Sequence, residues 1–351
     1  MNYKNITNDS LFDDVFRLEK LQEMGDPLYR LNQVIDWELF LPILEKVYEK
    51  DRKSNAGAPA YCPIMMFKIL ILQRYYNLSD FQTEYQIIDR HSFSQFLGLV
   101  RSSSIPDEKT IWRFRERLSV LDLERELFEQ FHHVLNNEGL LVSEGKIVDA
   151  SFVEVPRQRN SKKENEYIKE NNCAPKEWHS NKNKLRQKDV NARWAKKRNE
   201  KHFGYKNHIK IDSDSKLITD YTSSSAEVHD SKALDLLIGD DTDQDCKFYA
   251  DSAYTGERCD KLIDESKMEN NVNEKGVRNK PLTDQQKENN KEKSKTRARV
   301  EHVFGFMENS MGNLQMKCIG FERSSTIIGL INLTYNLFRY EQIIRLKLMV
   351  K

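Results

Sequence analysis

The sequence predicts an all-helical N-terminal part followed by a mixed α/β domain. Up to about residue 140, short apolar segments with helical spacing alternate with tight polar turns. From Gly145 onward the chain contains runs rich in β-branched and aromatic residues, which are typical of strands. The expected order after Gly145 is three strands, a helix, a strand, a helix, a weak strand and a helix. This order predicts a mixed sheet flanked by helices.

The composition restricts the class of protein. The 351 residues can bury a large core in one to three domains. Charged residues make up 32% of the chain, but the net charge is only +1, so any nucleic-acid partner must be argued from local patches. The five cysteines form no C-x-x-C pair, which argues against a zinc site or a disulfide framework and for a reducing compartment. Without a signal region or a long apolar stretch, we expect a cytoplasmic protein without membrane contact.

The helical part divides into an N-terminal segment, residues 1–60, and a module, residues 61–140. The segment is predicted to contain helices at Leu11–Met24 and Trp37–Tyr48. The module is predicted to contain helices at Ile64–Tyr76, Phe81–Asp89, His91–Leu97, Glu108–Leu118 and Leu121–Asn137. Short helices joined by tight turns are typical of helix-turn-helix DNA-binding modules.

One helix of this module is strongly basic. Asp107 is its expected N-cap, and the cations crowded on it are Lys109, Arg113, Arg115 and Arg117. A DNA-binding helix explains this pattern, and so does a plain helical bundle with a basic face exposed to solvent. Both interpretations stay open at this point.

Residues 156–203 form a basic insertion after the first predicted strand. Fifteen lysines and arginines face only six acids there, and Tyr167, Trp178 and Trp194 lie between them. Cations with interleaved aromatic rings predict a phosphate-binding surface. The alternative is a disordered insertion that merely keeps the protein soluble.

The mixed α/β part of the chain is expected to form one domain over residues 141–351. Its predicted strands are Lys146–Val155, His202–Asp212, Leu217–Thr222, Cys246–Asp251 and a weak one at Asn270–Asn273. Its predicted helices are Ser231–Ile238, Gly256–Met268, a late helix over Lys295–Met307 and a C-terminal helix over residues 327–348. The polar segment Pro281–Lys295 is expected to be mobile.

The late helix has an apolar stripe and a charged pair. The residues at i, i+3, i+4 and i+7 spacing are Val300, Val303, Phe304 and Met307. Arg297 and Glu301 lie one turn apart at the edge of this stripe. An ordinary surface ion pair accounts for them, and so does a carboxylate that holds a metal beside a phosphate.

Two aspartates upstream favour the second interpretation. Asp149 lies inside the first strand, where an ionised and unpaired carboxylate would be costly, and Asp251 ends the fourth strand. Together with Glu301 they would gather negative charge that only cations could offset. Magnesium prefers such oxygen ligands and shares phosphate oxygens, and two ions can promote an in-line displacement at phosphorus. Taken singly, an aspartate at a strand end is more often a cap or turn residue than a metal ligand.

Several blocks of the sequence resemble the signature blocks of DDE transposases, most closely the insertion sequence 5 family. These blocks are Lys146-Ile-Val-Asp149, His202-Phe-Gly-Tyr-Lys-Asn-His208, Val228-His-Asp-Ser231, Tyr249-Ala-Asp-Ser-Ala-Tyr-Thr-Gly256 and Arg297-Ala-Arg-Val-Glu-His-Val-Phe304. The helical stretch Tyr61–Leu118 also resembles that family's N-terminal module, so the resemblance covers nearly the whole chain. It implies a ribonuclease H-like catalytic domain in which Asp149, Asp251 and Glu301 form the metal-binding triad.

The resemblance also implies an activity and its partners. We expect a transposase that cuts DNA at terminal inverted repeats and joins the ends to target DNA, with two Mg²⁺ or Mn²⁺ ions, as a homodimer on DNA in a bacterial cytoplasm, on the nucleoid. His208 and His229 are expected near the site. The residues expected to contact DNA are Arg297, Arg299, Lys206, Lys109, Arg113, Arg117, Lys196, Lys197 and Arg198.

Two positions depart from the family pattern on the late helix. Ser294 stands where relatives often have a tyrosine, and Glu308 stands where they often have a lysine that contacts DNA. Arg299, Lys293 or Lys317 could replace that lysine. The alternatives to a transposase are a ribonuclease H-like nuclease or resolvase that cuts without joining, and an inactive copy that only binds DNA.

Overall fold

The computed structural model describes residues 13–49, 59–100, 103–141, 144–158, 160–197, 199–239, 243–276, 281–312 and 315–348. The chain divides into two compact units. The first unit comprises Met1–Gln73 and Leu78–Arg115, and the second comprises Arg74–Asn77 and Glu116–Lys351.

The described residues of the first unit are helical. Its elements are α1 (Asp13–Glu23), α2 (Pro27–Val34), η1 (Trp37–Phe40), α3 (Leu41–Glu45), η2 (Lys46–Tyr48), α4 (Pro63–Tyr75), α5 (Asp80–Asp89), α6 (His91–Leu97) and α7 (Glu108–Val120), of which α4 and α7 continue into the second unit. Aromatic rings fill its core, with Trp37 edge-on to Phe96 at 5.6 Å between ring centroids and Phe40 against Phe67 at 4.9 Å. The sequence did not predict α2, and the single helix predicted over Trp37–Tyr48 is three short helical pieces. Leu11 and Phe12 lie outside the described residues.

The basic helix α7 begins at the predicted cap. The Thr110 amide donates to Asp107 Oδ1 at 2.8 Å. Lys109 and Arg113 are exposed. Arg115 instead binds the Asp80 carboxylate with its Nη1 2.6 Å from Oδ1, so it holds the first unit together. The basic face of α7 therefore includes one arginine with a structural role.

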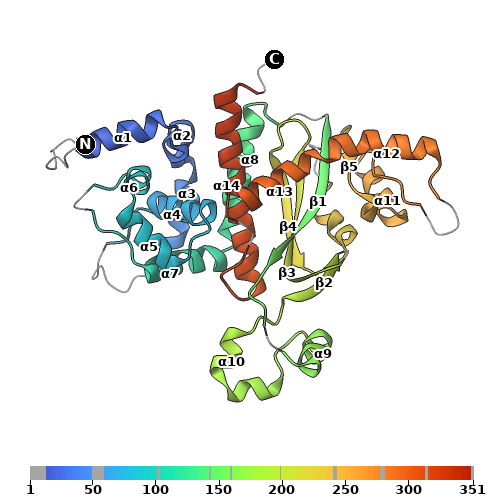
Figure 1. The fold of residues 1–351 in the computed structure, drawn as a ribbon, viewed down its shortest axis with the longest axis horizontal. Helices are drawn as coiled ribbons and strands as arrows, with labels where there is room; N and C mark the ends of the chain where they lie inside the picture. The colour runs from blue at the N-terminus through green and yellow to red at the C-terminus, as the bar shows by residue number, and fades with distance from the viewer. Residues whose placement is uncertain are drawn as a thin grey trace, which may run out of the picture. The chain divides into compact units, whose positions relative to one another are not determined.

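The second unit is built on one mixed sheet (Figure 1). Its strands are β1 (Gly145–Glu154), β2 (Arg193–Lys197), β3 (Glu200–Asp212), β4 (Ile218–Ser225), β5 (Lys247–Tyr249) and β6 (Glu269–Asn270). The strand order is β2-β3-β1-β5-β6, with β4 also paired to β3. The pairs of β3 with β1, β2 and β4 are antiparallel, and the pairs of β5 with β1 and β6 are parallel. This sheet and the helical N-terminal region confirm the predicted fold class.

Helices cover both faces of the sheet. Asn332 of α14 (Phe321–Leu346) exchanges hydrogen bonds with Asn207 of β3, on the face that also carries Asp149. Helix α8 (Leu123–Asn137) packs beside α14 (Figure 1). The other face buries an apolar cluster that includes Val148, Leu234 of η4 (Asp230–Leu236) and Ile263 of α11 (Glu257–Glu265).

The basic insertion is ordered over its described residues. It forms α9 (Lys162–Asn171), η3 (Lys176–Ser180) and α10 (Lys182–Gln187) before β2, which the sequence did not predict as a strand. Glu164 connects these pieces, because its Oε1 accepts from Trp178 Nε1 at 2.7 Å and from Lys184 Nζ at 2.6 Å. Trp178 is buried. This arrangement argues against a disordered insertion.

The largest departures from the predicted elements lie near the site. The segment expected to be mobile is the helix α12 (Asp284–Arg297). It lacks apolar residues and hence a periodic signal, but Thr283 and Gln286 form a capping box that could have revealed it. The late helix is interrupted at Ala298 and continues as α13 (Arg299–Asn309). Among the described residues, no helix is long and apolar enough to cross a membrane.

Candidate active site

Asp149 projects from the middle of the sheet. It lies on the central strand β1, directly opposite Ile209 of β3. Its Oδ1 accepts a hydrogen bond from the Ala150 amide at 2.8 Å, and its side chain is only 15% exposed. The apolar residues on either side bury the strand, so this carboxylate is held where water can solvate it only in part.

Asp251 follows the neighbouring parallel strand. The register pairs Ile147 with Tyr249, so Asp251 lies the same two residues beyond this pair as Asp149 does on β1. Its Oδ1 caps the short helix η6 (Ser252–Tyr254) by accepting from the Ala253 amide at 2.8 Å. Its charge is close enough to act on Asp149, because Asp251 contributes to the raised pKa of Asp149. The two aspartates therefore lie side by side on β1 and after β5.

Glu301 comes from α13, whose apolar stripe packs on the sheet. All four residues of the predicted stripe are buried, namely Val300, Val303, Phe304 and Met307. This burial confirms the predicted stripe. Glu301 lies in the first turn of the helix, and its side chain is 63% exposed. The helix thus brings an acid to β1 from a distant part of the sequence.

Arg297 links two of the three acids. Its Nη1 lies 3.2 Å from Asp149 Oδ2, and its Nη2 lies 3.2 Å from Glu301 Oε1. The predicted Arg297–Glu301 pair is therefore present, even though the helix is interrupted between them. The additional contact with Asp149 was not foreseen, because a contact across 148 residues leaves no local pattern in the sequence.

The pKa of Asp149 reflects the crowding of charge at this place. The pKa is raised to about 6, chiefly by burial and also by the charge of the neighbouring Asp251. The Ala150 amide, Arg297 and Lys197 act in the opposite direction by stabilising the ionised form. A carboxylate in this position requires a nearby cation to remain ionised at neutral pH.

The three acids have the chemistry that a divalent metal ion requires. Carboxylate oxygens are hard ligands, and the crowded charge of Asp149 and Asp251 favours a cation beside them. In the part of the chain that the structure describes, however, no three His, Cys, Asp or Glu side chains are grouped closely enough to hold a metal. The guanidinium of Arg297 contacts Asp149 and Glu301 instead. The residue types therefore suit a metal centre. In this structure, the guanidinium of Arg297 occupies the space between Asp149 and Glu301.

Lys206 and the two candidate histidines have hydrogen-bond partners other than the three acids. Lys206 and His208 pair with Phe152 and Ala150 of β1, so their side chains point to the opposite face of the sheet. Lys206 Nζ is 2.7 Å from Asp230 Oδ1, and burial lowers the pKa of His208 to about 4. His229 caps η4.

The other expected DNA contacts have different surroundings. Arg299 donates to Ser213 O at 2.8 Å and Asp214 Oδ1 at 2.7 Å, so it fastens α13 to the turn after β3. Lys196 and Lys197 are exposed at the end of β2, and Lys197 lies over the Phe152 ring. In α7, Arg117 is half-buried, whereas Lys109 and Arg113 are exposed. Arg198 lies outside the described residues.

Sequence reasoning did not single out two residues near the acids. Asp230 is the partner of Lys206. Tyr254 is fully buried, and its hydroxyl has no hydrogen-bond partner among the residues that the structure describes. Burial raises the pKa of Tyr254 well above its usual value, and the charges of Asp230, Asp149 and Asp251 raise it further. Both residues lie within the sequence blocks that resemble the transposase signature blocks, and their place in these blocks could have indicated them.

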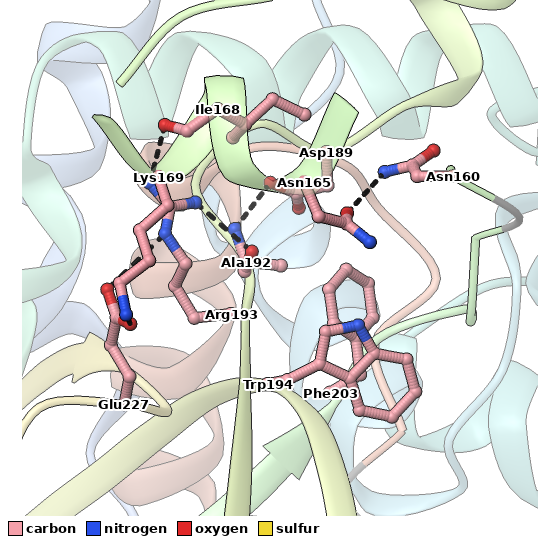
Figure 2. Close-up of a pocket in the computed structure, with 10 residues that line it drawn as sticks. All are labelled: Asn160, Asn165, Ile168, Lys169, Asp189, Ala192, Arg193, Trp194, Phe203 and Glu227. Carbon is pink, nitrogen blue, oxygen red and sulfur yellow. Dashed lines mark hydrogen bonds and ion pairs between the residues drawn. The ribbon is translucent and has the colours of Figure 1, made fainter. Parts of the chain in front are cut away.

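A pocket of about 170 Å³ opens where the insertion meets the sheet (Figure 2). Trp194 and Phe203 form an aromatic wall, with ring centroids 5.0 Å apart, and Trp194 is 42% exposed. Arg157 lies over the Trp194 ring at 5.9 Å. The residues that complete the lining are Asn160, Asn165, Ile168, Lys169, Asp189, Ala192, Arg193 and Glu227. The pocket combines an accessible ring with cations.

The family comparison defines the class of protein, a DDE enzyme that cuts and joins DNA strands. The chain belongs to the Transposase DDE domain family, whose model matches residues 142–337. Residues 16–117 match a second model, Transposase domain (DUF772). The chain is thus a DNA transposase. A solved structure, the cryo-EM structure of the piggyBac transposase synaptic complex with hairpin DNA, aligns over 93% of this chain and 77% of its own chain, with 13% identity and a TM-score of 0.44.

Proposed function

We propose that this transposase, of the insertion sequence 5 type, cleaves DNA at the terminal inverted repeats of its element and transfers the freed 3′-hydroxyls to target DNA. Asp149, Asp251 and Glu301 would hold two Mg²⁺ ions, or Mn²⁺ in their place. The observation that supports this most strongly is that Arg297 contacts both Asp149 of β1 and Glu301 of α13, while Asp251 follows the strand β5 beside Asp149. Family membership favours a divalent metal ion at this place.

The bound metal ions, two backbone amides and Arg297 would each have a separate role in the reaction. Bound metal ions would supply Lewis-acid activation of the attacking and leaving oxygens of an in-line displacement at phosphorus. Backbone amides of Ala150 and Ala253 bind Oδ1 of Asp149 and of Asp251, and Arg297 contacts the other oxygen of Asp149. Arg297 would neutralise a phosphate, which its planar fork of donors can bind at two oxygens.

DNA binding would be spread over the chain. The helical module within residues 61–140 would contribute the exposed cations of α7, and the insertion would contribute Lys196 and Lys197. A transposase must bring two element ends together, so we propose a homodimer on DNA. Its place would be the bacterial cytoplasm, on the nucleoid.

Incubation with duplex DNA ending in the inverted repeat tests this function. The repeat can be found in the DNA that flanks the reading frame. With Mg²⁺, the wild-type chain should give cleaved and strand-transfer products, and Asp149→Ala should give neither. Asp264→Ala, an exposed aspartate on α11, is the matched control and should retain both.

Three outcomes would change the conclusion. Undiminished cleavage by Asp149→Ala would exclude Asp149 as a ligand. Cleavage without joined products would favour the nuclease or resolvase. Binding without any cleavage by the wild-type chain would favour the inactive copy.

A further inference from the structure

One guanidinium serves two of the three acids of the proposed metal site. Arg297 ends α12, and its two terminal nitrogens each lie 3.2 Å from a different acid, Asp149 and Glu301. Divalent ions such as Mg²⁺ bind oxygen at about 2.0–2.1 Å. Because a cation between these two acids would need the same space, the guanidinium and a metal ion exclude each other there.

A cation beside Asp149 stabilises its ionised form. Asp149 is largely buried beside Asp251, and an unpaired carboxylate in that setting is costly. Arg297 supplies the compensating charge from the helix end. Loading the site is therefore an exchange of one cation for another, and the contacts of Arg297 help to set the affinity for metal.

Arg297 is itself incompletely paired in this position. Its Nε is buried and has no hydrogen-bond partner among the described residues. A phosphate group could accept two parallel bonds from the guanidinium, a geometry that two separate carboxylates do not offer. The side chain is 21% exposed and stands at the end of α12, so it can turn away without unwinding a helix.

We propose that Arg297 is an exchangeable counter-cation that holds Asp149 and Glu301 until a DNA phosphate draws it away and releases both acids for metal. This inference rests on the proposed function. Because coupling between two binding events is reciprocal, DNA should tighten metal binding and metal should tighten DNA binding by the same factor. The exchange would keep a DNA-cutting site unloaded while the protein is away from DNA.

Mn²⁺ titration of the full chain tests the exchange, with free Mn²⁺ followed by electron paramagnetic resonance. The wild-type chain should bind Mn²⁺ about tenfold more tightly when duplex DNA ending in the inverted repeat is present. Without DNA, Arg297→Gln should bind Mn²⁺ about tenfold more tightly than the wild type and gain at most roughly twofold from DNA. Lys261→Gln on α11 is the matched control and should behave as the wild type, because its exposed ammonium pairs with Glu265 instead of the acids.

Two further variants make the outcome decisive. Arg297→Lys keeps the charge, but its single ammonium group cannot contact both acids as the guanidinium does. It should therefore tighten Mn²⁺ binding less than Arg297→Gln does. It replaces Arg297→Gln in the test if that variant fails to fold. Asp149→Asn should lose the tight Mn²⁺ binding. In the presence of DNA, the Mn²⁺ that still binds to this sample gives the amount bound by the DNA alone.

The variants also separate the two proposals. Wild-type Mn²⁺ affinity in Asp149→Asn would refute the metal site itself. Loss in Asp149→Asn together with unchanged or weaker binding in Arg297→Gln would overturn the exchange alone. A full DNA effect in Arg297→Gln would also overturn it.

Discussion

Ser294 and Glu308, the two residues that depart from the family pattern, have different surroundings. Ser294 Oγ accepts a hydrogen bond from Asn273 Nδ2 at 3.1 Å, so it has a structural partner next to β6. Glu308 is exposed on α13. An acid at that position would repel a DNA backbone lying along the helix, whereas Ser294 adds no charge.

We predict that Glu308→Lys strengthens DNA binding. Replacing a repulsive acid by a cation adds about one phosphate contact, so the slope of log affinity against log salt should steepen by about 1. Fluorescence anisotropy with labelled terminal-repeat DNA over a range of salt measures this slope. Glu265→Lys, on the exposed side of α11, makes the same charge change elsewhere, and an equal effect from it would show that only net charge matters.

Close packing of three elements holds the second unit together. Gly329 lets α14 approach β4 and α8 so closely that a Cβ at this position would lie 2.4 Å from the Tyr221 hydroxyl and 2.9 Å from Glu124 Cγ. Glu124 is buried in this contact, and its Oε2 lacks a hydrogen-bond partner among the described residues. The helix that covers the Asp149 face therefore depends on one small residue.

Gly329→Ala should destabilise the protein. The added methyl group must displace a buried ring, and overpacking of this kind costs about 1–3 kcal/mol. Chemical denaturation measures the loss in the free energy of unfolding. Gly305→Ala on α13 is the matched control, because its Cβ would meet only Asn309 Nδ2 at 4.0 Å, and a helical Gly-to-Ala change at an open site should be neutral or stabilising. Equal losses in the two variants would contradict this account.

Glu124 should make stability depend on pH. Burial raises its pKa from 4.5 to about 7, so the folded state favours the protonated form. Its contribution to stability is complete below pH 4.5 and is lost as the pH rises through about 7. Glu124→Gln mimics the protonated acid. Between pH 4.5 and pH 8, the wild type should lose about 3 kcal/mol of its free energy of unfolding through Glu124, and this variant should not. Free energies of unfolding at both pH values measure this, with the exposed Glu170→Gln as control, and parallel pH curves for Glu124→Gln and the wild type would refute it.

At the scale of the whole molecule, a net charge of +1 conceals strongly basic surfaces. The insertion concentrates its cations around α9, α10 and β2. Trp194 lines the pocket at the base of the insertion (Figure 2) and is exposed, and Arg157 lies over its ring. An exposed ring flanked by cations suits nucleic acid, because a base can stack on the ring while the cations attract phosphates.

Trp194→Ala should weaken the binding of single-stranded DNA about tenfold, because stacking of one base contributes about 1–3 kcal/mol. Trp194→Phe keeps a stacking surface and should retain most of the affinity. Anisotropy titrations with single-stranded and duplex oligonucleotides of equal length measure both variants. If Trp194→Ala binds single-stranded DNA like the wild type, the ring has no part in DNA binding.

The sequence by itself determined much of the fold, and the role of the three acids stays a prediction. The apolar stripe of α13, the Asp107 cap and the long strands β1 and β3 depend on neighbours in the chain, and such local patterns can be read directly. The helix α12 was not predicted because its sequence has no apolar face. The strand β5 is shorter than predicted because only three of its residues pair with β1.

Only the tertiary structure decided what surrounds the acids. Arg297 meets Asp149 across 148 residues, and Lys206 turns to the opposite face of the sheet, where Asp230 neutralises it. Which charges meet depends on how helices dock on a sheet and on which face a strand residue points to. Long-range packing determines both, and a linear pattern of residues does not contain it.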